Sequence, residues 1–89
     1  MPHPRFSNEE IVRRGEEIYA SQMRDQFEEL YQDKIVIINI ENGEYEIDDD
    51  ALTASKRALA KHPGAAIYGL RVGSRFMYEF SGILGQAKQ

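Results

Sequence analysis

A run of carboxylates between residues 44 and 50 is the first feature of this 89-residue chain that could carry chemistry: Glu44, Glu46, Asp48, Asp49 and Asp50. Mg²⁺ and Ca²⁺ need several oxygen ligands that converge on one point. The spacing of these carboxylates is not that of a calcium-binding loop. In a strand, Glu44, Glu46 and Asp48 would instead project in a row from one face. We interpret Glu44, Glu46 and Asp48 as a solvated acidic row. Two alternatives stay open, a docking face for a basic partner at this row and a divalent-metal-dependent enzyme that uses the Asp48–Asp50 cluster.

Other catalytic groups are scarce. His3 and His62 are the only imidazoles, and a structural or surface role is expected for both. The chain has no cysteine, which excludes a thiolate nucleophile, a thiolate metal site and a disulfide. No catalytic-triad, zinc or nucleotide-loop spacing is present. We therefore expect a non-enzymatic protein with no catalytic residues, no bound metal and no cofactor.

Basic and aromatic residues lie together near the C-terminal end, where Arg71 and Arg75 are close to Tyr68, Phe76 and Tyr78. Sheet aromatics with flanking arginines are typical of single-strand nucleic-acid binders. The net charge of −4 and the pI of about 5.1 disfavour a general phosphate-binding surface. Nucleic-acid binding through Arg71 and Arg75 is therefore kept only as an alternative.

The segment 34–48 is predicted to be a β-hairpin, because Asn42-Gly43 between two alternating runs favours a two-residue type I′ turn. That turn would pair Ile40 with Tyr45 and Ile38 with Ile47. The apolar face of this hairpin would then face the core and comprise Val36, Ile38, Ile40, Tyr45 and Ile47. The acidic row would lie on the opposite face.

A long helix is predicted before this hairpin. Ser7 and Glu10 form a capping box, and apolar residues recur at helical spacing to about Tyr31. Some 25 residues would span roughly 37 Å, more than the roughly 30 Å expected across a compact chain of this size. The helix should therefore bend near Gly15 or, as we favour, pack its N-terminal half against another chain. The interaction surface would comprise Ile11, Val12, Gly15, Ile18 and Tyr19.

A short helix and a second hairpin should follow. Asp48–Asp50 would cap a helix ending near Lys61-His62, with Leu52, Ser55, Ala58 and Leu59 facing inward. Gly73-Ser74 favours a type II′ turn that pairs Gly69 with Tyr78 and Leu70 with Met77. Both faces of this second hairpin are apolar, so a helix should cover one face and a partner chain the other.

These elements predict an α+β fold in the order αββαββ, with both helices packed on a mostly antiparallel sheet. Residues 1–89 should form a single domain, with a loose lead-in at 1–6 and a frayed tail at 82–89. No apolar run approaches the roughly 18 residues of a membrane helix. The first residues lack an apolar leader, which predicts a cytoplasmic protein without membrane contact.

The chain resembles a family of small uncharacterised bacterial proteins that are frequent in cyanobacteria. The resemblance rests on the segments EEIVRRGEEIYASQMRDQFE, KIVIINIENGEYEIDDDALTASKRAL and HPGAAIYGLRVG, roughly residues 8 to 73. It implies partners encoded by small neighbouring genes, among them ones that resemble retroviral-type aspartic proteases, and an antitoxin-like role. It implies no catalytic residues. We expect a protein-interaction module that self-associates, with a dimer favoured, and that binds a cognate partner.

Overall fold

The computed structural model of this protein describes residues 5–73 and 77–78. It confirms the predicted α+β class, with these elements in chain order: α1 (Asn8–Ile18), η1 (Tyr19–Met23), α2 (Arg24–Leu30), β1 (Ile35–Asn39), β2 (Tyr45–Asp48), α3 (Ala51–Lys61), β3 (Ile67–Arg71) and β4 (Met77–Tyr78). The order differs from the predicted αββαββ because the first helix is divided into three segments.

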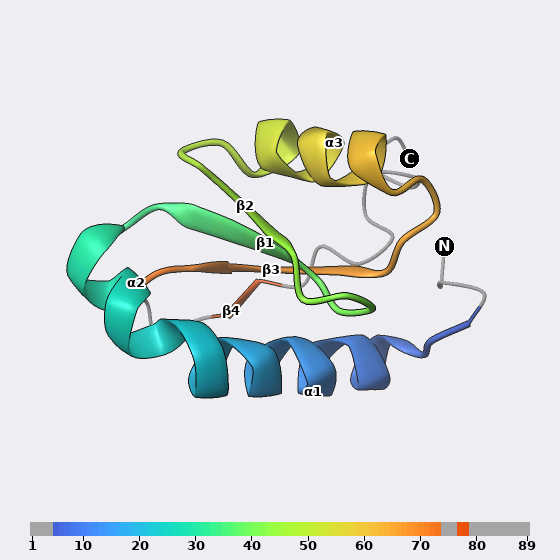
Figure 1. The fold of residues 1–89 in the computed structure, drawn as a ribbon, viewed down its shortest axis with the longest axis horizontal. Coiled ribbons are helices and arrows are strands. Elements are labelled where there is room, and N and C mark those ends of the chain that lie inside the picture. Colours follow the sequence, from blue (N-terminus) through green and yellow to red (C-terminus); the bar gives the residue numbers. More distant parts are fainter. Residues whose placement is uncertain (1–4, 74–76, 79–89) are drawn as a thin grey trace.

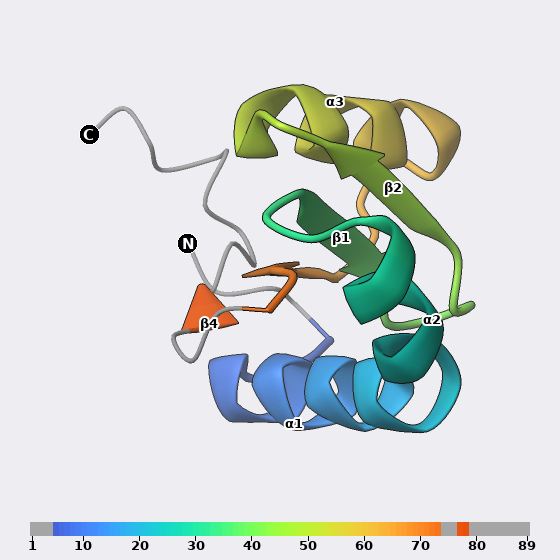
Figure 2. The same ribbon diagram turned by 90° about the vertical axis from the view of Figure 1, so that its left-hand side faces the viewer.

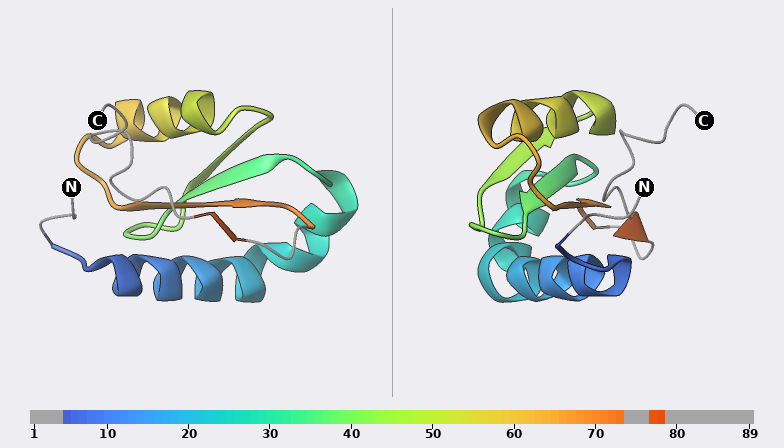
Figure 3. Two further views of the ribbon diagram at one scale, coloured as in Figure 1. Left: turned by 180° about the vertical axis from the view of Figure 1, so that it is seen from behind. Right: turned by 90° about the vertical axis from the view of Figure 1, so that its right-hand side faces the viewer.

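The strands form one antiparallel sheet in the order β2-β1-β3-β4, so the two hairpins meet through β1 and β3. The helix α1 lies on one face of this sheet and α3 on the other (Figure 1, Figure 2). The view from behind in Figure 3 shows the same three layers. Because β1 is central and covered on both faces, all five of its residues are buried.

Each face of the sheet has its own apolar cluster. The cluster on the α1 side includes Ile11, Phe27, Val36, Ile38, Tyr68 and Leu70. The cluster on the α3 side comprises Ile35, Ile37, Ala54, Ala58 and Ile67. Both faces of β3 are therefore covered, as predicted. The covering elements are α1 and α3 of the same chain, which corrects the expectation of a partner chain on one face.

Two side-chain caps predicted from the sequence are present. The Ser7 hydroxyl accepts from the amide of Glu10 at 3.1 Å, and the Glu10 carboxylate accepts from the amide of Ser7 at 3.1 Å. The Asp50 carboxylate accepts from the amide of Thr53 at 2.9 Å at the start of α3. Such contacts satisfy amides that have no partner within their own helix.

The first helix does not overhang the body, which corrects the favoured expectation. It bends at the π-helical segment η1, where the amide of Arg24 donates to the carbonyl of Tyr19, and α2 then turns toward the sheet (Figure 1). The 11 residues of α1 span about 16 Å, well within the 34 Å longest extent of the molecule. The helix therefore bends, as the alternative expectation had it, but the bend lies after Gly15 rather than near it.

The register of the first hairpin is shifted by two residues from the prediction. Ile38 pairs with Tyr45 and Val36 with Ile47, and the turn has four residues, 40–43, because the amide of Asn39 donates to the carbonyl of Glu44. Only Gly43 in this turn has a positive φ, of +82°, whereas a type I′ turn needs two such residues. A shift of an even number of residues leaves the two faces of the hairpin unchanged.

The second hairpin has the predicted register where it is described, with Gly69 paired to Tyr78 and Leu70 to Met77. Its turn residue Ser74, together with Arg75, Phe76 and the tail 82–89, lies outside the described residues. Two inward assignments were wrong: Tyr45 is 46% exposed and Leu52 is 46% exposed. Tyr45 lies on an edge strand, and Leu52 lies on the side of α3 away from the buried Ala54 and Ala58.

Candidate interaction surface

The edge strand β2 presents two chemically different sides. Its acidic row (Glu44, Glu46 and Asp48) lies on the α3 side, and Tyr45 and Ile47 lie on the side of α1 and α2, because neighbouring residues of a strand point to opposite faces. The sheet order leaves the outer edge of β2 without a neighbouring strand in the described part of the chain.

The acidic row is not a fully solvated face, which corrects the sequence interpretation. The Glu46 side chain is only 12% exposed, and it accepts from Arg57 Nε at 3.0 Å and from Lys61 Nζ at 2.5 Å. Arg57 also donates from one terminal nitrogen to Asp48 at 3.1 Å and from the other to the carbonyl of Ile47 at 2.8 Å. The basic flank of α3 thus pairs with the carboxylates of β2.

These contacts shift the pKa values of the carboxylates. The hydrogen bond from Lys61 is the main reason that the pKa of Glu46 is lowered, and Arg57 adds to it. The pKa of Asp48 is lowered first by the amide of Asp50 and then by Arg57. The pKa of Asp50 is lowered by its hydrogen bonds from Thr53. All three groups are therefore held in the ionised form.

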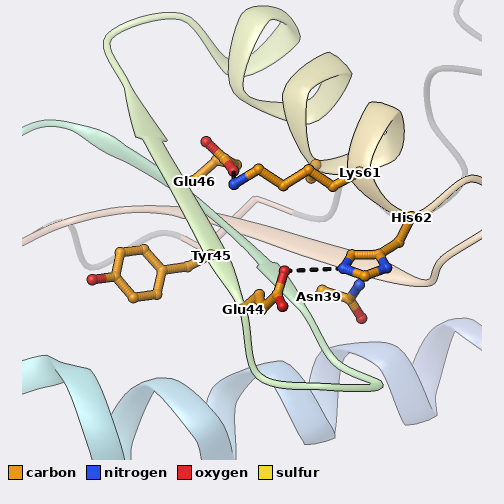
Figure 4. Close-up of a pocket in the computed structure, with 7 residues that line it drawn as sticks. Asn39, Glu44, Tyr45, Glu46, Lys61 and His62 are labelled. Carbon is orange, nitrogen blue, oxygen red and sulfur yellow. Dashed lines mark hydrogen bonds and ion pairs between the residues drawn. The ribbon is translucent and has the colours of Figure 1, made fainter.

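A small hollow lies where the first hairpin meets the end of α3 (Figure 4). It is lined by Asn39, Glu44, Tyr45, Glu46, Ala58, Lys61 and His62. His62 Nε2 lies 3.0 Å from Glu44 Oε1, so these two polar groups already contact each other there. The hollow has a volume of about 10 Å³, which is room for about one water molecule. It can hold a bridging water.

The other side of β2 carries an aromatic group centred on Phe27. The Phe27 ring makes edge contacts with Tyr45 at 5.0 Å, with Tyr31 at 5.1 Å and with Tyr19 at 6.3 Å. Phe27 itself is buried, whereas Tyr31 is half-buried and Tyr45 is half-exposed. Leu30, at the end of α2, is 57% exposed. We call Leu30, Tyr31 and Tyr45 the α2–β2 face.

The predicted interaction surface on α1 is largely used inside the chain. Ile11, Gly15 and Tyr19 are buried against the sheet, and only Val12 and Ile18 are half-buried. An apolar helix stripe alone cannot reveal whether its own sheet or another chain covers it. The sequence also could not reveal that Leu30 and Tyr45 are exposed, because both residues fit the apolar pattern of their elements.

The geometry also bears on the two alternative sites. Tyr68 is fully buried under α1, so it offers no stacking platform to a nucleic-acid base, and Arg71 donates to the carbonyl of Asp33 at 3.0 Å. In the acidic cluster, Asp48 already accepts a hydrogen bond from Arg57 and Asp50 accepts one from Thr53. Asp49 pairs with Lys34 at 2.7 Å. Within residues 5–73 and 77–78, no three acidic or histidine side chains converge as metal ligands would.

Comparisons with protein-family models, with curated proteins and with solved structures gave no match. None of the helices in the described part of the chain is both long and apolar enough to cross a membrane.

Proposed function

We propose that this chain is a self-associating protein-interaction module and that its contact surface is the α2–β2 face. The observation that carries the proposal is the exposure of Tyr45 (46%), whose ring contacts the buried Phe27, and of Leu30 (57%), three residues after Phe27 in α2. Tyrosine is enriched in the centres of protein interfaces, because it buries a large apolar ring and keeps a polar tip.

The supporting ring system makes Tyr45 a well-positioned anchor. Phe27 holds the Tyr45 ring by an edge contact at 5.0 Å with an interplanar angle of 70°. A side chain that is already ordered loses less conformational entropy when a partner covers it. Burying the exposed part of Leu30 would add roughly 1 to 2 kcal/mol.

The charges of α2 also favour a second copy of the chain as the partner. The helix α2 carries Arg24 one turn before Glu28, and both residues are exposed. Two copies of α2 that run antiparallel across a two-fold axis would place each Arg24 beside the Glu28 of the other copy. Two-fold interfaces use the same patch on both subunits and therefore need such self-complementary charges.

Light scattering coupled to size exclusion, over a range of protein concentrations, tests the proposal. We expect the native chain to have twice the monomer mass, and Leu30→Glu to have the monomer mass. Leu52→Glu is the matched control, because Leu52 is 46% exposed but lies on α3. We expect it to behave as the native chain does. A native chain that stays monomeric throughout, or equal effects of the two substitutions, would contradict the proposal.

A further inference from the structure

We propose that Arg57 closes the outer edge of β2 against strand pairing with a second copy of this chain. An open edge strand presents unpaired amides and carbonyls, which another strand can use. The proposal concerns the backbone of β2, and it stands independently of the side-chain contacts of the α2–β2 face.

The ladder between β1 and β2 shows which backbone groups point outward. The amide of Asn39 donates to the carbonyl of Glu44, so Asn39 and Glu44 direct these two backbone groups toward each other across the ladder. Hydrogen-bonded and non-bonded pairs alternate along antiparallel strands. Glu46 and Asp48 therefore direct their backbone groups toward β1, whereas Tyr45 and Ile47 direct theirs toward the outer edge.

Arg57 occupies one of these outward groups. Its terminal nitrogen lies 2.8 Å from the carbonyl oxygen of Ile47, while its other two nitrogens hold Glu46 and Asp48. An added strand would lie about 4.8 Å from β2 and would donate an amide to the same oxygen. The guanidinium and the added strand thus compete for the same acceptor.

The partner that fits this edge is β2 of a second copy. Two antiparallel β2 strands related by a two-fold axis at Ile47 would exchange two hydrogen bonds between their Ile47 backbones. That pairing would place Glu46 opposite Asp48 of the other copy, where like charges destabilise the pair unless cations neutralise them. Arg57 therefore has two opposing effects on this pairing. It covers the carbonyl of Ile47, which hinders pairing, and it neutralises the acidic row, which favours pairing.

The substitution Arg57→Lys separates these two effects. Lysine keeps the positive charge beside the carboxylates, but a compact ammonium cannot match the fork that reaches three acceptors at once. Arg57→Ala removes both effects. We expect Arg57→Lys to self-associate more strongly than Arg57→Ala at neutral pH, and the difference to shrink as the pH falls and the carboxylates become protonated.

The experiment is performed with Leu30→Glu as the parent chain, so that the α2–β2 face does not contribute. We expect Leu30→Glu to keep the monomer mass and the double variant Leu30→Glu/Arg57→Lys to reach twice that mass. Lys56→Arg in the same parent is the matched control, since Lys56 is the exposed neighbour of Arg57 on α3. We expect this control to keep the parent mass.

Amide hydrogen exchange measured by NMR shows whether the association is strand pairing. The Ile47 amide faces outward, and pairing should slow its exchange by about tenfold or more. Circular dichroism confirms that each variant is folded. A folded Arg57→Lys variant with the parent mass would overturn the proposal, and so would an associated form with unchanged Ile47 exchange. If Leu30→Glu does not lower the native mass, the proposed function fails, but the comparison of Arg57→Lys with its parent still decides this inference.

Discussion

Gly15 of α1 lies directly against the ring of Tyr68 in β3: a Cβ atom at residue 15 would be 2.3 Å from Cδ2 of Tyr68. Tyr68 is fully buried, so the ring has no free space to move into. The missing side chain of Gly15 therefore sets how closely α1 approaches the sheet.

This contact predicts that Gly15→Ala destabilises the fold. Alanine favours a helix over glycine by roughly 1 kcal/mol, but overpacking a core costs about 1 to 3 kcal/mol or more. We expect the free energy of unfolding in urea to fall by at least about 1 kcal/mol. Glu16→Ala, on the exposed side of α1, is the control and should change it by less than about 0.5 kcal/mol. An equal or higher stability of Gly15→Ala would show that α1 can shift away from Tyr68.

The hydroxyl of Tyr19 is buried and has no hydrogen-bond partner among the described residues. Burying a hydroxyl without a partner costs about 1 to 3 kcal/mol. We therefore expect Tyr19→Phe to be at least as stable as the native chain at neutral pH. Tyr45→Phe, at a half-exposed position, is the control and should change little. A loss of more than about 1 kcal/mol in Tyr19→Phe would reveal a partner for the hydroxyl.

The same residue predicts a dependence on alkaline pH. Burial is the main reason that the pKa of Tyr19 is raised above its usual 10.0. Above that pH the unfolded chain releases a proton that the folded chain keeps, so the stability of the native chain should fall as the pH rises. Urea unfolding across this range measures the fall. The fall should be smaller in Tyr19→Phe, and identical curves for the two chains would contradict this prediction.

The paired carboxylates predict a loss of stability in acid. The pKa values of Glu46 and of Asp48 and Asp50 are lowered from the usual 4.5 and 3.8. Their contribution is present above those usual values and disappears as the pH falls through the lowered ones. Glu46→Gln should be less stable at neutral pH, by less than about 1 kcal/mol because the partners are partly exposed. It should also lose less stability in acid.

Circular dichroism during urea unfolding at a series of pH values measures both effects. Glu17→Gln, on the exposed side of α1, is the matched control. It should follow the native curve. A Glu46→Gln variant with the native stability at every pH would mean that Lys61 and Arg57 contribute nothing to the fold through this carboxylate.

The four-residue turn predicts which substitutions of Gly43 the fold tolerates. Its φ of +82° is a left-handed conformation, although the space around it is open. Gly43→Ala should therefore cost about 1 to 2 kcal/mol through backbone strain alone. Gly43→Asn should cost clearly less, because asparagine tolerates this region better. Equal thermal stabilities of the two variants would contradict the assigned turn.

The sequence by itself determined the features that depend on neighbouring residues. Ser7 and Glu10 meet because they are three positions apart at a helix start, and Asp50 caps α3 in a similar way. The alternation of apolar and polar residues in the first hairpin determined its two faces, and the two-residue shift in register left these faces unchanged. The Gly73-Ser74 signal also predicted the pairing of Gly69 with Tyr78.

Only the tertiary structure decided the features that join distant parts of the chain. The turn at 40–43 depends on the burial of Ile40 and on the hydrogen bond from its amide to the carbonyl of Ala66 in the segment before β3. The stripe of α1 is covered by Tyr68, which lies more than 50 residues away in the sequence. The acidic row is neutralised by Arg57 because α3 packs over β2. Periodicity shows that a face is apolar or charged, but only packing selects the group that covers it.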